Sequence, residues 1–486
     1  MNRPIRTLSV FCLLLFLALM INATWLQYGK AKSLDNDPRN RRVIQAAFSR
    51  ERGAILVGKT AVATSVPSKD QYKWQRTYPK PQEYAPLTGY FSYYSQTGVE
   101  HSQNQVLSGD DSRLFVNRLV DLVNDTDPKG GNVELTIDPK VQDAAYQGLQ
   151  ALGKGVQGAA VAIEPSTGRI LAMVSTPTFD PNQLADHDIA KSTDTYNKLL
   201  KDPSQPLINR AIQTTLPPGS TFKLITASAA IEDLGMTPDS KVDGHSSMKL
   251  PQTTHVLHNE NDESCGGAKV TMTQALDRSC NVAFAGIGLK LTDDQLRTQA
   301  EKYGFGQHYL SDLAGQATSR FPSTLTPPLR AQSAIGQYEV AATPLQMAMV
   351  AAGIANHGVV MKPYLVDRVT SSDLDVLDQT DPTQLSTAVT PKTASLLTQM
   401  MVSVVDHGTG TAARIPGVEV AGKTGTAQST PSRPPYAWFT SFAPAENPKI
   451  AVAVLVQSSN TDRTEIAGGA LCAPIAKAMM EAVINP

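Results

Sequence analysis

The chain has 486 residues, with 43 Lys or Arg against 44 Asp or Glu, so its formal charge is −1. Hydrophobic residues make up 41% and charged residues 18%, which excludes a disordered, collagenous or polytopic membrane protein, and the absence of a basic excess argues against a nucleic-acid binder. Four cysteines are too few for a disulfide scaffold and show no CxxC metal spacing. The length fits about two to four domains.

The N-terminus carries an apolar stretch from Leu8 to Leu26, preceded by Arg3 and Arg6. Its 19 residues would span about 28 Å as a helix, enough to cross the hydrocarbon core. We expect residues 1–29 to be a cytoplasmic tail and an uncleaved membrane anchor, with a cleaved signal peptide as the alternative because Gly29-Lys30-Ala31 offers a small-x-small site. Basic residues flank the stretch on both sides, so charge gives no firm orientation. Either route would place the rest of the chain outside the cytoplasm, and we expect a single-pass protein of the cell membrane.

Residues 30–154 read as an N-terminal domain with weak periodicity. Its predicted segments are a basic, helix-prone stretch to about residue 60, loops and short strands over 60–125, a turn-rich connection Asp125–Gly131, a strand Val133–Ile137 and an amphipathic helix Pro139–Leu152. A boundary near Gly155 is expected.

Residues 155–486 have the texture of a mixed α/β core. The predicted strands form two hairpins, Ala159–Glu164 with Ile170–Val174 and Trp438–Ala443 with Ile450–Val456. The predicted helices include Thr221–Leu234, Thr273–Leu289, Pro344–Asn356 and Ala473–Val483.

A Ser-x-x-Lys sequence carries the first chemical signal. Ser220 and Lys223 lie at the start of a helix, just after Pro218 and Gly219, and three residues apart they project from one face. An activated nucleophile needs this geometry, a hydroxyl with a base within reach, and the helix N-terminus favours a developing oxyanion. A lysine acts as a base only if its pKa falls from about 10.4 towards neutrality, which burial and a second cation both promote.

Two further segments supply the remaining groups. Lys423 is the expected second cation, on a strand-like segment whose small residues Thr424, Gly425 and Thr426 let a substrate backbone approach closely. Ser279 and Asn281, in the helical region, offer a hydroxyl to relay a proton and an amide to hold a substrate.

Other matches to these short patterns lack the right context. Ser-x-x-Lys alone should occur about once or twice by chance, and Ser246–Lys249 matches it, but Pro251 follows almost at once, so no helix is expected there. His255 and His258 have an HxxH spacing without the usual zinc-binding set, so we expect no metal there.

Taken in order, Ser220–Lys223, Ser279–Asn281 and Lys423–Gly425 resemble the three motifs of the penicillin-recognising serine acyl-transferases, and the whole chain resembles class B penicillin-binding proteins. The resemblance implies a transpeptidase domain of α/β (α+β) class over 155–486, in which helices flank a central antiparallel sheet. It also implies an irregular, β-rich pedestal over 30–154, with no glycosyltransferase domain before it and no repeat module after it. Pedestal and transpeptidase landmarks that carry the resemblance are Arg52–Ile55, Thr97–Glu100, Leu107–Gly109, Thr136–Asp138, Ile335–Gln337, Thr343–Gln346, Gly408–Gly410 and Trp438–Phe439.

The resemblance further implies a role for each motif residue. Ser220 would attack a D-Ala carbonyl of a peptidoglycan stem peptide, and Lys223 would take its proton. Ser279 would pass that proton to the leaving amine. Asn281 would orient Lys223 and the substrate amide. The terminal carboxylate would be held by Lys423 and the hydroxyls of Thr424 and Thr426, beside Gly425, with the backbone N–H groups of Ser220 and Thr426 as the oxyanion hole.

The resemblance implies that β-lactams acylate Ser220 as donor mimics and that no metal or organic cofactor is needed. A membrane glycosyltransferase of the cell-wall machinery is the expected partner, with a role in cell division. A serine β-lactamase, a D,D-carboxypeptidase and a largely scaffolding protein of the division complex remain alternatives. Cys280 departs from the commonest second motif. A Cys265–Cys280 disulfide is one hypothesis, and two buried free thiols are the other.

Overall fold

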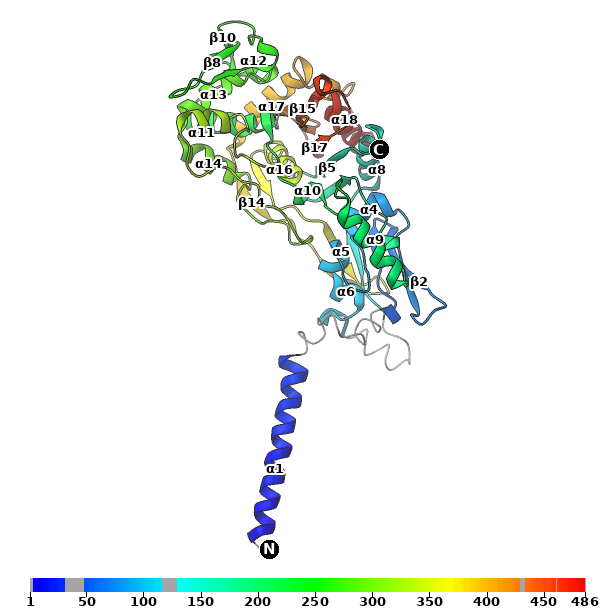
Figure 1. Ribbon diagram of the computed structural model, residues 1–486. Coiled ribbons are helices and arrows are strands. Elements are labelled where there is room, and N and C mark those ends of the chain that lie inside the picture. Colours follow the sequence, from blue (N-terminus) through cyan, green and yellow to red (C-terminus); the bar gives the residue numbers. More distant parts are fainter. Residues whose placement is uncertain (1–2, 31–47, 116–128, 429–432, 460, 486) are drawn as a thin grey trace.

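The structure is a computed structural model, and it describes residues 3–30, 48–115, 129–428, 433–459 and 461–485 (Figure 1). Parts of the predicted basic stretch and of the turn-rich connection, residues 31–47 and 116–128, lie outside the described residues.

A five-stranded antiparallel sheet forms the centre of the C-terminal body, in the order β15-β16-β17-β5-β6. Its strands are β5 (Gln157–Ile163), β6 (Ile170–Thr176), β15 (Ala421–Ala427), β16 (Tyr436–Ala443) and β17 (Ile450–Ser458). Both predicted hairpins are confirmed, and β17 joins them because it pairs with β16 on one side and β5 on the other. The apolar run of β17 is buried on both faces, which explains why it does not alternate with polar residues.

Helices cover this sheet on its two faces and extend beyond it, as the predicted fold class requires (Figure 1). On one face, every residue of α16 (Pro344–Ala355) is buried against the strands. The other face is covered by α8 (Pro139–Ala151) and α18 (Ala473–Ile484). The remaining helices of this body are α9 (Ile189–Lys201), α10 (Arg210–Gln213), α11 (Lys223–Leu234), α12 (Met272–Asp277), α13 (Asn281–Lys290), α14 (Asp293–Lys302), α15 (Pro327–Ser333) and α17 (Pro391–Asp406).

A second sheet, of six strands, carries the N-terminal part of the chain, in the order β13-β12-β4-β1-β2-β3. Its strands are β1 (Ile55–Val57), β2 (Thr60–Pro67), β3 (Trp74–Thr77), β4 (Asn132–Leu135), β12 (Val366–Thr370) and β13 (Val376–Gln379). The pairing of β12 with β4 crosses the boundary expected near Gly155. Helix α8, from before that boundary, packs on the central sheet. Residues from both sides of the expected boundary therefore build or cover each of the two sheets.

The region 60–125 contains more helix than its sequence predicts. Besides β2 and β3 it forms α4 (Pro81–Thr88), α5 (Gly98–Ser102) and α6 (Asn104–Ser108). The expectation of loops and short strands was therefore incomplete for 60–115. Two of these helices have five residues and the third contains Pro86, so none is long enough or regular enough to show a 3.6-residue pattern.

The N-terminal segment forms α1 (Arg3–Thr24), which continues as a wider helical turn η1 (Trp25–Gly29). In the part of the chain that the structure describes, this is the one helix long and apolar enough to cross a membrane. None of its residues is buried, and Figure 1 shows it standing clear of the folded body.

Three two-stranded antiparallel sheets complete the described strands. They pair β7 (Lys241–Asp243) with β10 (Lys269–Thr271), β8 (Ser247–Lys249) with β9 (Val256–His258), and β11 (Val359–Met361) with β14 (Gln384–Thr387). The second Ser-x-x-Lys match thus lies in a hairpin and not in a helix, as Pro251 predicts.

Candidate active site

Ser220 lies in a tight 3₁₀ turn, Gly219–Phe222, immediately before α11. The α-helix begins at Lys223, two residues later than the sequence predicted. Residues i and i+3 eclipse in a 3₁₀ turn, so Ser220 and Lys223 still share one face. Gly219 adopts a left-handed conformation with φ of 54°, and its amide donates to the carbonyl of Gly336 at 3.0 Å, which fixes the turn.

Lys223 is fully buried, and its amino group is directed at the second motif. Its Nζ donates to the carbonyl of Ser279 at 2.6 Å, to Asn281 Oδ1 at 2.9 Å and to Ser279 Oγ at 3.4 Å. Within the described residues, no hydrogen bond joins Lys223 to the hydroxyl of Ser220. The lysine is therefore held one turn from the serine, facing the group expected to relay the proton.

Ser279 occupies the connection between α12 and α13, with φ of 57°. The prediction of one helical region over Thr273–Leu289 is corrected here, because α12 ends at Asp277 and α13 starts at Asn281. A left-handed backbone costs a non-glycine residue about 1–2 kcal/mol. In return, the turn directs both the carbonyl and the hydroxyl of Ser279 towards buried lysines.

A disulfide joins Cys280 to Cys265, with the Cα atoms 6.2 Å apart. The first of the two hypotheses for these cysteines is therefore confirmed. The bridge ties the second motif to the segment after β9, where Asn259 Nδ2 lies 3.2 Å from Cys265 Sγ. Asn259 Oδ1 also accepts the amide of Val282 at 3.0 Å, which is a second link between this segment and the start of α13.

The third motif lies on β15, as its sequence predicts. Lys423 is fully buried, and its Nζ donates to Ser279 Oγ at 2.9 Å and to the carbonyl of Thr424 at 3.0 Å. A Cβ on Gly425 would lie 2.9 Å from the carbonyl oxygen of Pro218, so only glycine lets the strand approach the turn before Ser220 this closely. Thr426 is half-buried at the open end of the motif.

The two lysines carry strongly lowered pKa values. Burial lowers the pKa of Lys423 from 10.5 to about 7, opposed by the charges of Glu260 and Asp277. The pKa of Lys223 is held well below 10.5, mainly by burial and secondly by the charge of Lys423, while the charge of Glu260 acts in the opposite direction. The environment therefore favours a neutral amine at Lys223, which has a lone pair for a proton, beside a second lysine that titrates near neutrality.

The sequence did not single out several groups around these motifs. Thr409 Oγ1 lies 2.6 Å from Thr424 Oγ1. The backbone amide of Thr409 donates to the carbonyl of Asp277 at 3.1 Å. Asp277 Oδ2 accepts the Ser403 hydroxyl at 2.9 Å. Burial raises the pKa of Asp277. Gly408–Gly410 was noticed only as a family landmark, and nothing in the spacing of Asp277 or Asn259 points to the site.

The arrangement suits acyl transfer from a serine. One hydroxyl, Ser279 Oγ, is within hydrogen-bonding distance of both lysine Nζ atoms and so offers a path for a proton. His258, part of the HxxH spacing, pairs with Asp262 at 2.6 Å. Across the described ranges, no group of three or more His, Cys, Asp or Glu side chains is placed to hold a metal ion.

Comparison with known families places both parts of the chain. Residues 158–481 match the penicillin binding protein transpeptidase domain, and residues 52–133 match the penicillin binding protein A dimerisation domain.

Proteins of similar sequence include the peptidoglycan D,D-transpeptidases PbpA of Mycolicibacterium smegmatis and Mycobacterium tuberculosis. They are 44% and 41% identical, over 100% of this chain and 99% of each relative. Solved structures include penicillin-binding protein A from M. tuberculosis as a ceftriaxone acyl-enzyme complex. It is 40% identical, has a TM-score of 0.87, and the match covers 90% of this chain and 100% of that one. The penicillin G acyl-enzyme complex of the same protein, also 40% identical, matches over the same shares with a TM-score of 0.84.

Proposed function

The chain belongs to the penicillin-binding protein transpeptidases, and we propose that Ser220 is the residue through which it transfers peptidoglycan stem peptides. The activity is that of a serine-type D,D-transpeptidase of cell-wall synthesis that β-lactams acylate. The observation that carries the assignment of Ser220 is that it shares one face of the turn with Lys223. Burial holds the pKa of Lys223 well below its usual value, as a base at neutral pH requires.

In the proposed reaction, Lys223 turns from Ser279 to Ser220 when substrate fills the site and takes the hydroxyl proton. Hydrogen bonds of this kind are often incomplete before substrate binds. Ser220 Oγ then attacks the D-Ala carbonyl carbon, and the proton travels through Ser279 to the leaving amine. Contacts from Lys223 and Lys423 to Ser279 Oγ, at 3.4 and 2.9 Å, support this path.

We assign the donor's carboxylate to the open end of β15. Lys423, Thr424 and Thr426 supply a cation and two hydroxyls there, and Gly425 lets the substrate backbone lie close to the strand. Asn281 holds Lys223 through its Oδ1 atom. The backbone N–H groups of Ser220 and Thr426 form the proposed oxyanion hole.

The decisive experiment is the intact mass of the protein after exposure to a penicillin, for the wild type and Ser220→Ala. We expect one stable adduct on the wild type and none on the variant. Rapid loss of the adduct would favour a β-lactamase. A folded wild-type protein that forms no adduct would favour a scaffold. Stem-peptide products without cross-links would favour a carboxypeptidase.

The cellular setting is also part of the proposal. An N-terminal apolar helix fits a single-pass anchor, and we propose that it holds the catalytic body on the outer side of the cell membrane. A membrane glycosyltransferase is the expected partner, since cross-linking needs newly made glycan strands, and we propose a role in division. We retain residues 30–154 and 155–486 as the proposed pedestal and transpeptidase domains.

A further inference from the structure

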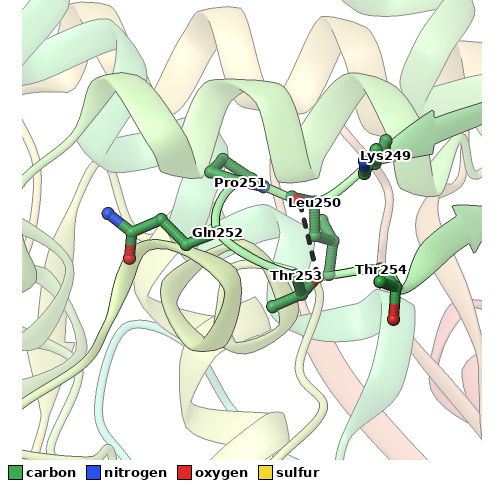
Figure 2. Close-up of a pocket in the computed structure, with 6 residues that line it drawn as sticks. All are labelled: Lys249, Leu250, Pro251, Gln252, Thr253 and Thr254. Atoms are coloured by element: carbon green, nitrogen blue, oxygen red, sulfur yellow. Dashed lines mark hydrogen bonds between the residues drawn. The ribbon is translucent and has the colours of Figure 1, made fainter.

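The segment after β9 borders the active site on the side of the second motif. The turn before β9, Lys249–Thr254, joins this strand to β8, and the Thr253 hydroxyl donates to the Leu250 carbonyl within it at 3.3 Å (Figure 2). β9 then ends at His258, whose carbonyl accepts Asn281 Nδ2 at 3.0 Å. The next residue, Asn259, accepts the amide of Val282 at 3.0 Å. Two hydrogen bonds therefore fix the chain here against the start of α13.

Glu260 follows directly, at the first position of a short 3₁₀ turn, Glu260–Asp262. Its side chain is exposed, and in the described part of the chain it has no hydrogen-bond or ion-pair partner. Asp262 in the same turn pairs with His258 instead. Glu260 is thus an unpaired carboxylate on a turn whose preceding residues are bonded to the start of α13.

The charge of Glu260 reaches into the site. Its negative charge opposes the lowering of the pKa of both Lys223 and Lys423, while Asp277 acts in this way on Lys423 alone. A surface carboxylate remote from the two lysines would be screened by water and would affect neither of them. Glu260 directly follows Asn259, which is bonded to the start of α13, so its exposed carboxylate lies beside the second motif.

Transpeptidation has an electrostatic difficulty that hydrolysis lacks. Lys423 suits the anionic donor, but the second substrate is an amine that is protonated in neutral water, and the ammonium form of Lys423 would repel it. A carboxylate beside the second motif would offset that repulsion. It would also stabilise the positive charge that the nitrogen gains as it adds to the ester.

We propose that Glu260 is an acceptor-binding residue that receives the amino group of the incoming stem peptide on the Asn281 side of the cleft. This inference rests on the proposed function. The acceptor loses one proton to water and, as a neutral amine, attacks the ester carbonyl carbon of acylated Ser220. A C–N bond replaces the C–Oγ bond, and the second amine proton passes to Ser220 Oγ.

The test uses the full-length protein in detergent with a D-Ala thioester donor. Acceptors are D-alanine, which carries an ammonium group, and methanol, which is uncharged. The measured quantity is the ratio of transfer to hydrolysis for each acceptor. For Glu260→Gln we expect the D-alanine ratio to fall about three- to tenfold, the range of a partly exposed ion pair, while the methanol ratio stays within about twofold.

Glu263→Gln is the matched control, because it removes the same charge from an exposed position three residues further along, and the pKa shifts of the two lysines include the charge of Glu260 but not that of Glu263. Its ratios should equal those of the wild type. Formation of the penicillin adduct by each variant reports a folded site. An unchanged D-alanine ratio in Glu260→Gln, or an equal fall for methanol, would overturn the proposal. Slower hydrolysis alone would also overturn it and make Glu260 a hydrolytic base. A wild type without any acyl-enzyme would overturn the proposed function itself, which is a distinct result.

Discussion

The titration of Lys423 near neutral pH gives the acylation reaction a predicted alkaline limit. Burial lowers the pKa of this lysine from 10.5 to about 7, which corresponds to about 5 kcal/mol of lost preference for the ammonium form. The proposed role of Lys423 needs that ammonium, because it binds the carboxylate shared by stem peptides and penicillins. About half of the free enzyme then carries the charge at pH 7, and about one molecule in a hundred at pH 9.

The second-order rate constant of penicillin acylation should therefore fall about fiftyfold between pH 7 and pH 9. On the acid side it should rise with pH, because Lys223 must lose its proton to act as a base, and its pKa is held below 10.5 by burial and by Lys423. The product of the two requirements is a bell-shaped profile. Stopped-flow or quenched-flow mass measurements from pH 5 to pH 9, corrected for spontaneous hydrolysis of the penicillin, would record it.

Lys423→Arg is the matched variant, because a guanidinium keeps its charge throughout this range. We expect its acylation to be slower at pH 7, since Arg does not reproduce the 2.9 Å contact with Ser279 Oγ, but to show no decline towards pH 9. A wild-type rate constant that stays level or rises from pH 7 to pH 9 in a folded protein would refute the reasoning. So would an alkaline limb that persists in the arginine variant.

Two further predictions concern the scaffold. Glu100→Gln should destabilise the N-terminal sheet by about 3–5 kcal/mol, because the buried carboxylate contacts two buried arginines at 2.6 Å each. Asp110→Asn, which breaks an exposed ion pair, should cost less than about 1 kcal/mol. Urea unfolding of the two variants compares these free energies. Gly336→Ala should abolish penicillin acylation, since its Cβ would lie 2.2 Å from the carbonyl oxygen of Gly219, the residue before Ser220. Gly58 has a similar positive φ but open space around it, so Gly58→Ala should lose only about 1 kcal/mol of stability and still form the adduct. An active Gly336→Ala protein would contradict the packing argument.

Local sequence patterns were sufficient for the elements whose periodicity and turn residues agree with the fold. The two hairpins of the central sheet, helix α16 and the strand that carries Lys423 follow from apolar runs bounded by turn residues. The short helices α4, α5 and α6 could not be predicted in this way, because five to eight residues are too few to show a period. The pairing of β12 with β4 joins residues more than 200 positions apart, a distance at which pattern carries no information.

The active site shows the same difference between what local sequence patterns predict and what contacts between distant segments decide. The sequence by itself determined which residues we propose for the chemistry, because Ser220 with Lys223, Ser279 with Asn281, and Lys423 are each recognised by a particular residue type at a fixed local spacing. Only the tertiary structure decided how these groups act on one another. The left-handed turn at Ser279, the disulfide at Cys280 and the position of Glu260 depend on contacts between segments that meet only in the folded chain. Burial, which lowers the lysine pKa values, is likewise a property of packing, since it depends on how much water the surrounding elements exclude.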